Sequence, residues 1–202
     1  MPGYELIGKS EFKEISEIFK KSKILCRMGF DKLRSGVYKV RTFEKLFAKF
    51  MHSKYTLGVT SGTAALRVAL STIDLKPGDE IITQPFTFVA TVEAIIEARA
   101  TPVLAEIDET LNLDPNDLLK KITKKTKAVI VVHMLGVPAK LDKIKSICDK
   151  KNIALIEDTA WGCGGKYKKK YLGTWGRIGT FSFDHVKAIT TGEGGMVVFK
   201  NK

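Results

Sequence analysis

The stretch FSFDHVKAITTGEGGMVVFKNK, residues 181–202, decides the fold prediction. It begins with a short apolar segment, places His185 and Lys187 two residues apart, and passes through a glycine-rich turn into a second apolar segment. Short apolar runs bounded by glycine are typical of buried strands. The stretch therefore predicts two strands joined by a loop that carries a histidine and a lysine. The question it raises is which of these two side chains does chemistry.

Upstream of this stretch the chain alternates between short apolar strands and helices. The expected strands are YTLGVT (55–60), KPGDEIITQ with its opening turn (76–84), TPVLAEID (101–108), AVIVVHM (128–134) and IALIED (153–158). The expected helices are GTAALRVALSTI (62–73), TFVATVEAIIEAR (87–99), DPNDLLKKI (114–122) and AKLDKIKSICDKK (139–151), preceded by two more near 12–19 and 42–52. Near-continuous apolar strands separated by helices predict a largely parallel sheet covered on both faces.

The composition is that of a globular protein. Of the 202 residues, 44% are hydrophobic and 6 are prolines. No apolar run approaches the roughly 20 residues that span a bilayer, and the basic start lacks the apolar core of a signal peptide. Three widely spaced cysteines without a CxxC pair argue against a disulfide framework or a zinc site. We therefore expect a cytoplasmic protein with no membrane partner and no metal.

The positive charge is concentrated in lysine clusters. The formal net charge is +12, and much of it lies in KKITKKTK (120–127) and KYKKK (166–170). Such clusters are compatible with nucleic-acid binding, with anionic small substrates, or with a solvated surface. Because neither cluster contains arginine, we favour the solvated surface and expect no nucleic-acid partner.

Candidate ligand-binding residues follow the first two strands of the expected sheet. In parallel sheets, ligands bind where strands end and the next helices begin. Ser61, Gly62 and Thr63 stand at a helix N-terminus, where free N–H groups and hydroxyls suit a phosphate, although a plain serine cap explains them equally well. Phe88 follows the second strand and is either a flat face for a bound ring or, more simply, a core residue of its helix.

Charged side chains follow the later strands. The strand 153–158 ends in Glu157 and Asp158, and a carboxylate there either caps a helix or holds a ligand cation such as a protonated ring nitrogen. Lys187 lies just beyond a buried strand, where desolvation lowers an amine's pKa and makes it a nucleophile for a carbonyl, whereas a surface lysine is the competing interpretation. Together with Ser182, these groups are the parts needed to hold pyridoxal phosphate (PLP) by its phosphate, ring face, ring nitrogen and aldehyde.

The sequence resembles the DegT/StrS family of PLP-dependent sugar aminotransferases, which have the aspartate-aminotransferase (type I) fold. The segments that carry the resemblance are SGTAAL (61–66), PFTFVATVEAI (85–95), VHMLGVPAKLD (132–142), IEDTAWGCGGKYKKKYLGTWGRIGTFSF (156–183) and KAITTGEGGMVV (187–198). The resemblance implies a three-layer α/β/α large domain with a mostly parallel, mixed sheet. We expect an N-terminal arm with helices over 1–54 and an incomplete PLP-binding domain over 55–202, with the family's C-terminal small domain absent.

By position, the resemblance also implies the residues that hold the cofactor. Ser61, Gly62 and Thr63 would bind its phosphate, together with the Ser182 hydroxyl. Phe88 would stack on the pyridine ring. These roles match the phosphate and ring sites suggested above by the residues themselves.

The catalytic assignment follows in the same way. Asp158 would pair with the ring nitrogen, and Lys187, five residues after Ser182, would bond to the cofactor aldehyde. His185 falls two residues short of that position, so the resemblance favours Lys187 and an aminotransferase over the dehydratase branch that has histidine there. Trp161 stands where the family usually carries Gln or His beside the ring hydroxyl, so we expect it to line that side of the cofactor.

The implied reaction is ping-pong transfer of an amino group, with glutamate as donor, to a keto-sugar of cell-surface polysaccharide or lipopolysaccharide biosynthesis. MPGYELIG (1–8) and AEIDETL (105–111) resemble the branch that makes 8-amino-3,8-dideoxy-octulosonate, whereas other branches act on nucleotide-linked sugars. Family members are about twice this length and form homodimers. A non-catalytic PLP-binding or regulatory relative, or an inactive fragment, is the alternative.

Overall fold

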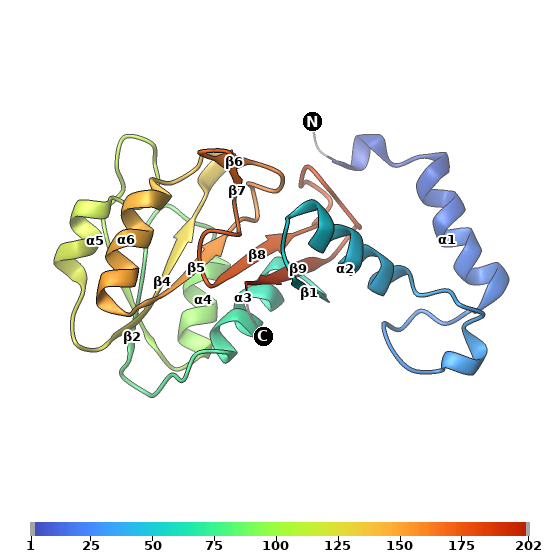
Figure 1. The fold of residues 1–202 in the computed structure, drawn as a ribbon, viewed down its shortest axis with the longest axis horizontal. Helices are drawn as coiled ribbons and strands as arrows, with labels where there is room; N and C mark the ends of the chain where they lie inside the picture. The colour runs from blue at the N-terminus through green and yellow to red at the C-terminus, as the bar shows by residue number, and fades with distance from the viewer. Residues whose placement is uncertain (1–2, 201–202) are drawn as a thin grey trace.

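The computed structural model describes residues 3–200, in which a seven-stranded sheet is sandwiched between helices (Figure 1). The strands of this sheet are β1 (Tyr55–Val59), β2 (Glu80–Thr83), β3 (Thr101–Leu104), β4 (Thr126–Val132), β5 (Ala154–Asp158), β8 (Ile178–Ser182) and β9 (Gly195–Phe199). The α-helices are α1 (Lys9–Lys21), α2 (Lys39–Phe50), α3 (Gly62–Ser71), α4 (Val89–Glu97), α5 (Pro115–Lys121) and α6 (Leu141–Lys151). Three 3₁₀ turns (Gly3–Leu6, Asp31–Leu33 and Met134–Gly136) and a small hairpin of β6 (Lys166–Tyr167) and β7 (Lys170–Tyr171) complete the described elements.

The sheet is mostly parallel and mixed, as the sequence predicts. Its strand order is β1-β9-β8-β5-β4-β2-β3. The strands from β8 to β3 pair in parallel, whereas β9 pairs antiparallel with both of its neighbours, so β9 alone runs against the other six. The carboxyl ends of β1, β5 and β8 therefore meet at one edge of the sheet, next to the start of β9.

Two apolar cores, one on each face, confirm the three-layer architecture. Residues of α3 and α4 pack on one face of the sheet, and residues of α5 and α6 pack on the other. Along β5 the alternation is direct, since Ile156 belongs to the first core and Leu155 to the second. Because both faces are covered, the central strands are apolar throughout rather than alternating with polar residues. The helix α5 begins as predicted, with Asp114 accepting a hydrogen bond from the Asn116 N–H.

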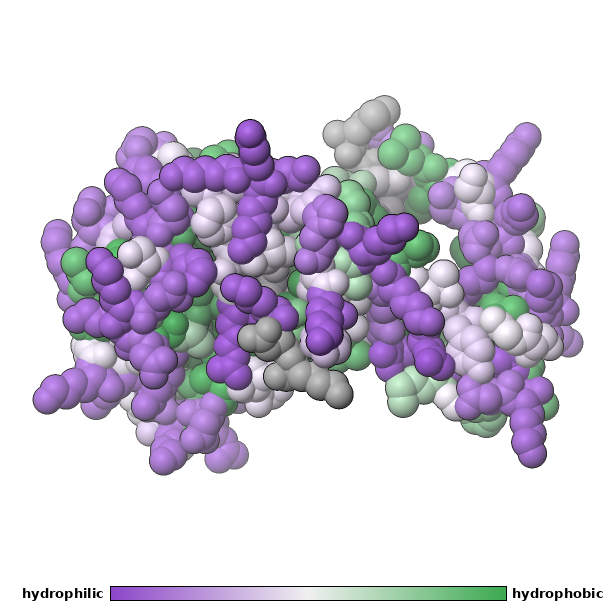
Figure 2. Space-filling model, in the orientation of Figure 1, coloured by the Kyte–Doolittle hydropathy of each residue, from purple (hydrophilic) through white to green (hydrophobic). Residues whose placement is uncertain are grey.

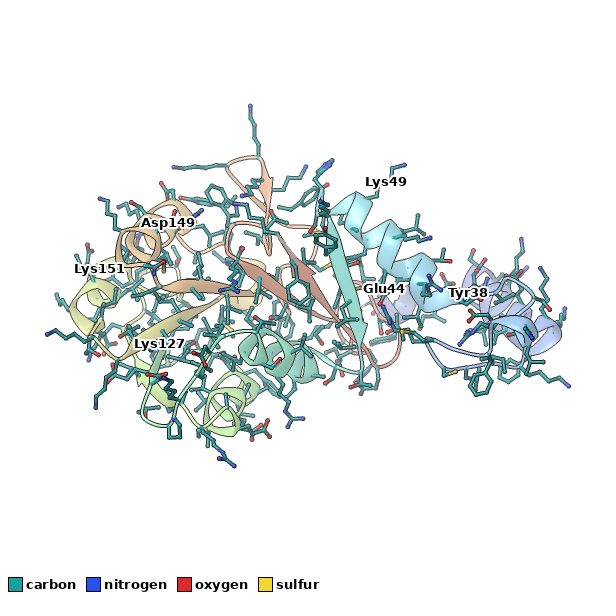
Figure 3. The ribbon with its side chains drawn as sticks, turned by 60° about the horizontal axis from the view of Figure 1, so that its bottom comes forward. Tyr38, Glu44, Lys49, Lys127, Asp149 and Lys151 are labelled. Atoms are coloured by element: carbon teal, nitrogen blue, oxygen red, sulfur yellow. The ribbon has the colours of Figure 1, made fainter. Side chains whose placement is uncertain are left out.

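The helix α2 lies along β1 and closes a third apolar cluster on the same face as α5 and α6 (Figure 3). Phe47 packs edge-on against Phe181 of β8. Glu44, labelled in Figure 3, accepts a hydrogen bond from the Gly58 N–H at 2.8 Å and binds Arg27 at 2.6 Å. Gly58 allows this approach, because a Cβ at this position would lie 3.2 Å from Val40. This helix thus belongs to the body of the sheet domain.

The helix α1 lies at the outer end of the molecule, where its Glu14 and Glu17 pair with Lys39 at the start of α2 (Figure 1). The sequence predicts its apolar face, but Phe12, Ile15 and Phe19 remain exposed. The division of the chain at residue 54 stays a prediction. The helix α2 lies before residue 54 and packs on the sheet. None of the helices in residues 3–200 has the length and hydropathy of a membrane span. On the face drawn in Figure 2, hydrophilic side chains cover much of the surface.

One buried carboxylate connects β5 to the loop that leads into β8. Glu157, fully buried, accepts hydrogen bonds from the backbone N–H groups of Gly173, Trp175 and Gly176 at 2.8, 2.6 and 2.7 Å. Its Oε2 also lies 3.2 Å from Nε2 of His133, at the end of β4. A carboxylate that accepts several backbone donors is well compensated for its burial. Glu157 therefore fixes the path of the chain toward β8.

We predict that E157Q destabilises the fold, because a glutamine amide places N–H groups against backbone donors where the carboxylate accepted them. The free energy of unfolding should fall by about 3 kcal/mol, measured by urea denaturation. The matched control is E97Q, which removes an exposed ion pair with Arg67 and should change that free energy by less than about 1 kcal/mol. Equal effects of the two substitutions would contradict the anchoring role.

Candidate functional site

A cavity of about 320 Å³ opens at the sheet edge where β1, β5 and β8 end. All eight residues that the sequence singles out for the site line it, namely Ser61, Gly62, Thr63, Phe88, Asp158, Trp161, Ser182 and Lys187. They come from four separate segments of the chain, which the topology brings to one place. A cavity of this size is in the usual range for small-molecule sites. Among residues 3–200, no cluster of His, Cys, Asp or Glu is arranged to hold a metal ion.

One end of the cavity is the N-terminus of α3. Ser61 is its N-cap, since its Oγ accepts a hydrogen bond from the Ala64 N–H at 3.0 Å. The first N–H groups of a helix have no partner within the helix, so this end attracts anions. Gly62 packs against Ser182 of β8, and a Cβ on Gly62 would lie 2.9 Å from the Ser182 Cβ. The glycine thus lets the start of α3 and the end of β8 approach closely. This brings the hydroxyls of Ser61 and Ser182 to the same end of the cavity.

The cavity floor carries the Asp158 carboxylate at the end of β5. Asp158 is 6% exposed, and its two oxygens accept hydrogen bonds from the Ala160 N–H and the Thr91 hydroxyl, each at 3.1 Å. Burial raises the pKa of Asp158, while these two hydrogen bonds and the charge of Lys187 act in the opposite direction. The arrangement is suited to a cationic ligand group placed above the carboxylate.

The Lys187 amine enters the cavity from the loop between β8 and β9. Asp184 shapes the loop, because its backbone carbonyl accepts from the Lys187 N–H and its side chain accepts from the Val186 N–H. The Lys187 amine lies 3.6 Å from the centre of the Trp161 ring. Burial lowers the pKa of Lys187, and the charges of Asp184 and Asp158 partly oppose this. A partly desolvated amine is a better nucleophile near neutral pH than an ordinary surface lysine.

Two aromatic rings flank the cavity. Phe88 precedes α4 and is 68% exposed, so the simpler sequence-based expectation, a core residue of its helix, is wrong. Trp161 is 42% exposed and presents its ring face to the lysine. Aromatic faces that remain accessible in a cavity are available for a flat ligand.

Two residues that the sequence placed near the site lie elsewhere. The His185 side chain is 65% exposed, faces Asp184 and does not line the cavity. Glu157 faces the opposite side of β5 from Asp158, as successive strand residues do. Of the ionisable residues that the sequence singles out, Asp158 and Lys187 thus line the cavity, where Asp184 and Glu193 join them.

Sequence reasoning missed two buried polar residues behind the cavity. Thr91 sits within an apolar helix pattern, and its only signal is a hydroxyl four residues after Thr87. His133 directly follows β4, and its Nδ1 accepts a hydrogen bond from the Ala139 N–H at 3.2 Å. Its Nε2 therefore carries the proton that is donated to Glu157. Neither role is visible without the tertiary contacts.

Comparison with known proteins agrees with this geometry. Residues 17–202 match the DegT/DnrJ/EryC1/StrS aminotransferase family. The chain belongs to this family. It is 44% identical to a GDP-perosamine synthase of Escherichia coli O157:H7 over 164 residues, covering 81% of this chain and 45% of that protein.

Two further family relatives extend the match to almost the whole chain. The spore coat polysaccharide biosynthesis protein SpsC of Bacillus subtilis is 40% identical over 95% of this chain and 47% of its own length. The PLP form of the sugar aminotransferase Spr1654 of Streptococcus pneumoniae, itself described as putative, superposes with a TM-score of 0.87 at 27% identity over 97% of this chain and 52% of that chain. The chain thus spans about half the length of the curated relatives it matches.

We predict that Lys187 reacts with amine reagents at lower pH than Lys168. Burial lowers the pKa of Lys187, whereas a hydrogen bond to Asp142 raises that of Lys168, so the neutral amine of Lys187 is present at lower pH. Competitive acetylation with trace reagent across a pH series, followed by peptide mass spectrometry, measures both residues in the same sample. If Lys168 is labelled at the lower pH, the cavity does not desolvate Lys187.

Proposed function

We propose that this chain is the PLP-binding part of an aminotransferase that moves an amino group from glutamate to a keto-sugar in nucleotide-sugar or polysaccharide biosynthesis. One observation carries the proposal. A helix N-terminus, a buried carboxylate and a desolvated amine line a single cavity together with an accessible aromatic face. Family membership and the PLP form of a solved relative support the same cofactor.

The residues present fit PLP. The start of α3, with Gly62 and Thr63, suits its phosphate, and the hydroxyls of Ser61 and Ser182 lie at the same end of the cavity. Asp158 is a carboxylate in a nearly dry environment, which suits a protonated ring nitrogen. When bound, PLP supplies the electron sink that stabilises the charge left on a substrate carbon after its proton leaves.

The remaining work falls to the chain's own side chains. Asp158 keeps the proton on the ring nitrogen, because an opposite charge favours the charged form. Phe88 would stack on the ring face, and Trp161 lines the side beside the Lys187 amine. Lys187 would hold the cofactor through its aldehyde. Its lowered pKa suits it to accept and return a proton at the substrate carbon.

The acceptor is proposed from the relatives. A GDP-perosamine synthase and a spore coat polysaccharide biosynthesis protein are among them, which supports a keto-sugar acceptor. Within that class we propose two candidates, a nucleotide-linked 4-keto sugar and the 8-keto precursor of 8-amino-3,8-dideoxy-octulosonate. We also propose that the whole protein acts in the cytoplasm as a homodimer.

We predict that PLP added to the protein gives visible absorption, and that borohydride reduction then attaches the cofactor to Lys187. K187A should abolish the covalent product, whereas K168A, which removes a surface lysine paired with Asp142, should leave it unchanged. D158N should weaken PLP binding by about tenfold or more, because a hydrogen bond to a charged group is worth roughly 1.5–3 kcal/mol. Peptide mass spectrometry locates the label.

Labelling of a different lysine would overturn the site assignment. Amino transfer is tested separately, by measuring 2-oxoglutarate released from glutamate in the presence of each keto-sugar. PLP bound at Lys187 with no 2-oxoglutarate from any acceptor would instead favour a non-catalytic relative.

A further inference from the structure

The Asp158 carboxylate is held by two donors that approach its two oxygens separately. The Ala160 N–H donates to Oδ1 and the Thr91 hydroxyl donates to Oδ2, both at 3.1 Å. The first donor lies two residues after Asp158, in the loop that follows β5, so it moves with the strand end. The second comes from α4, on a different layer of the fold. Thr91 is thus the residue through which α4 orients the Asp158 carboxylate.

The hydroxyl chain behind Asp158 has a fixed direction. A threonine hydroxyl has one proton, and Thr91 gives its proton to Asp158, which is an acceptor when ionised. The Thr91 oxygen lies 2.8 Å from the Thr87 Oγ1, so Thr87 must be the donor in that pair. Donation therefore runs from Thr87 to Thr91 to Asp158. Hydrogen bonds in series strengthen one another, so Thr87 makes Thr91 a better donor.

The burial of Thr91 shows that this contact is built into the fold. Thr91 has no exposed surface, whereas Thr87 is half-buried in the loop just before α4. A buried hydroxyl without an acceptor is costly, and the acceptor of Thr91 is the cavity carboxylate rather than a backbone carbonyl. Thr83 on β2 shows the contrasting case, since its buried hydroxyl donates to the Ile130 carbonyl at 2.9 Å.

We propose that Thr91, with Thr87 behind it, is a positioning residue that sets the direction of the Asp158 carboxylate and keeps it ionised. The inference deepens the proposed function and rests on it, because the group that Asp158 would hold is the ring nitrogen of PLP. The other ionisable groups near Asp158 are Lys187, from the loop after β8, and His133, from the end of β4. Glu157, next to it on β5, faces away. The two threonines add a chain of neutral hydrogen bonds to the Asp158 carboxylate, which the charge of Lys187 does not replace.

The first test needs no cofactor. The pKa of Asp158 is measured by ¹³C NMR of the carboxyl carbon in the protein alone, with D158N assigning the signal. T91V removes the donor without changing the side-chain volume, so the pKa should rise by about one unit, as expected for a lost hydrogen bond to a charged group. T91S should restore the wild-type value, and T87V should give a smaller rise. T83V, the matched control, should leave the pKa unchanged.

The second test uses PLP itself. Binding that needs an ionised Asp158 is lost as the pH falls through the pKa of that group. The acid-side midpoint of PLP binding should therefore move to higher pH in T91V by the same amount as the pKa, and T91S should reverse the shift. Absorption titrations at a series of pH values measure it.

The outcomes separate the two proposals. An Asp158 pKa that T91V leaves unchanged, or that T83V shifts equally, would overturn the positioning role. A pKa that rises in T91V while the wild-type protein fails to bind PLP would support the positioning role and overturn the proposed cofactor. A shift in both the pKa and the PLP midpoint, reversed by T91S, supports both.

Discussion

The structure depends on the way β5 ends, with two consecutive carboxylates on opposite faces of the sheet. Successive strand residues point in opposite directions, so Glu157 and Asp158 cannot share one role. Glu157 accepts three backbone N–H groups of the loop 173–176 and so directs the chain into β8. Asp158 faces the cavity. Because β8 leads on to Lys187, the structural carboxylate determines where the amine stands relative to the site carboxylate.

Close backbone approach is the second constraint at this edge. A Cβ at Gly62 would lie 2.9 Å from Ser182, and one at Gly195 would lie 2.3 Å from the Ser61 carbonyl. The start of α3, the end of β8 and the start of β9 therefore meet at distances that side chains would prevent. The glycines bring the N-terminus of α3 to the same place as the carboxylate and the amine.

The sequence predicts the sheet and the cavity lining, because buried parallel strands are apolar throughout and their ends collect the ligand-binding residues. It predicts less well what depends on tertiary contacts. Thr91 lies in an apolar helix pattern, and only its contact with Asp158 across two layers reveals its place. For Phe88 the apolar periodicity predicts a buried side chain. The ring is instead exposed, because Phe88 lies just before the start of α4. The apolar face of α1 is visible in the sequence, but the periodicity of apolar residues does not predict which element a helix packs against.

The charge distribution shows why an anion at the start of α3 would be held by backbone N–H groups rather than by lysine. The chain carries a net charge of +12, yet the ionisable residues that line the cavity are Asp158, Asp184, Glu193 and one lysine, Lys187. A second lysine near the carboxylate would compete with a ligand cation for it, and would also be able to react with a carbonyl. Helix N–H groups and hydroxyls attract an anion without either effect. Among residues 3–200 a single lysine lines the cavity, so the cavity offers one amine for reaction and differs electrostatically from the lysine-rich surface.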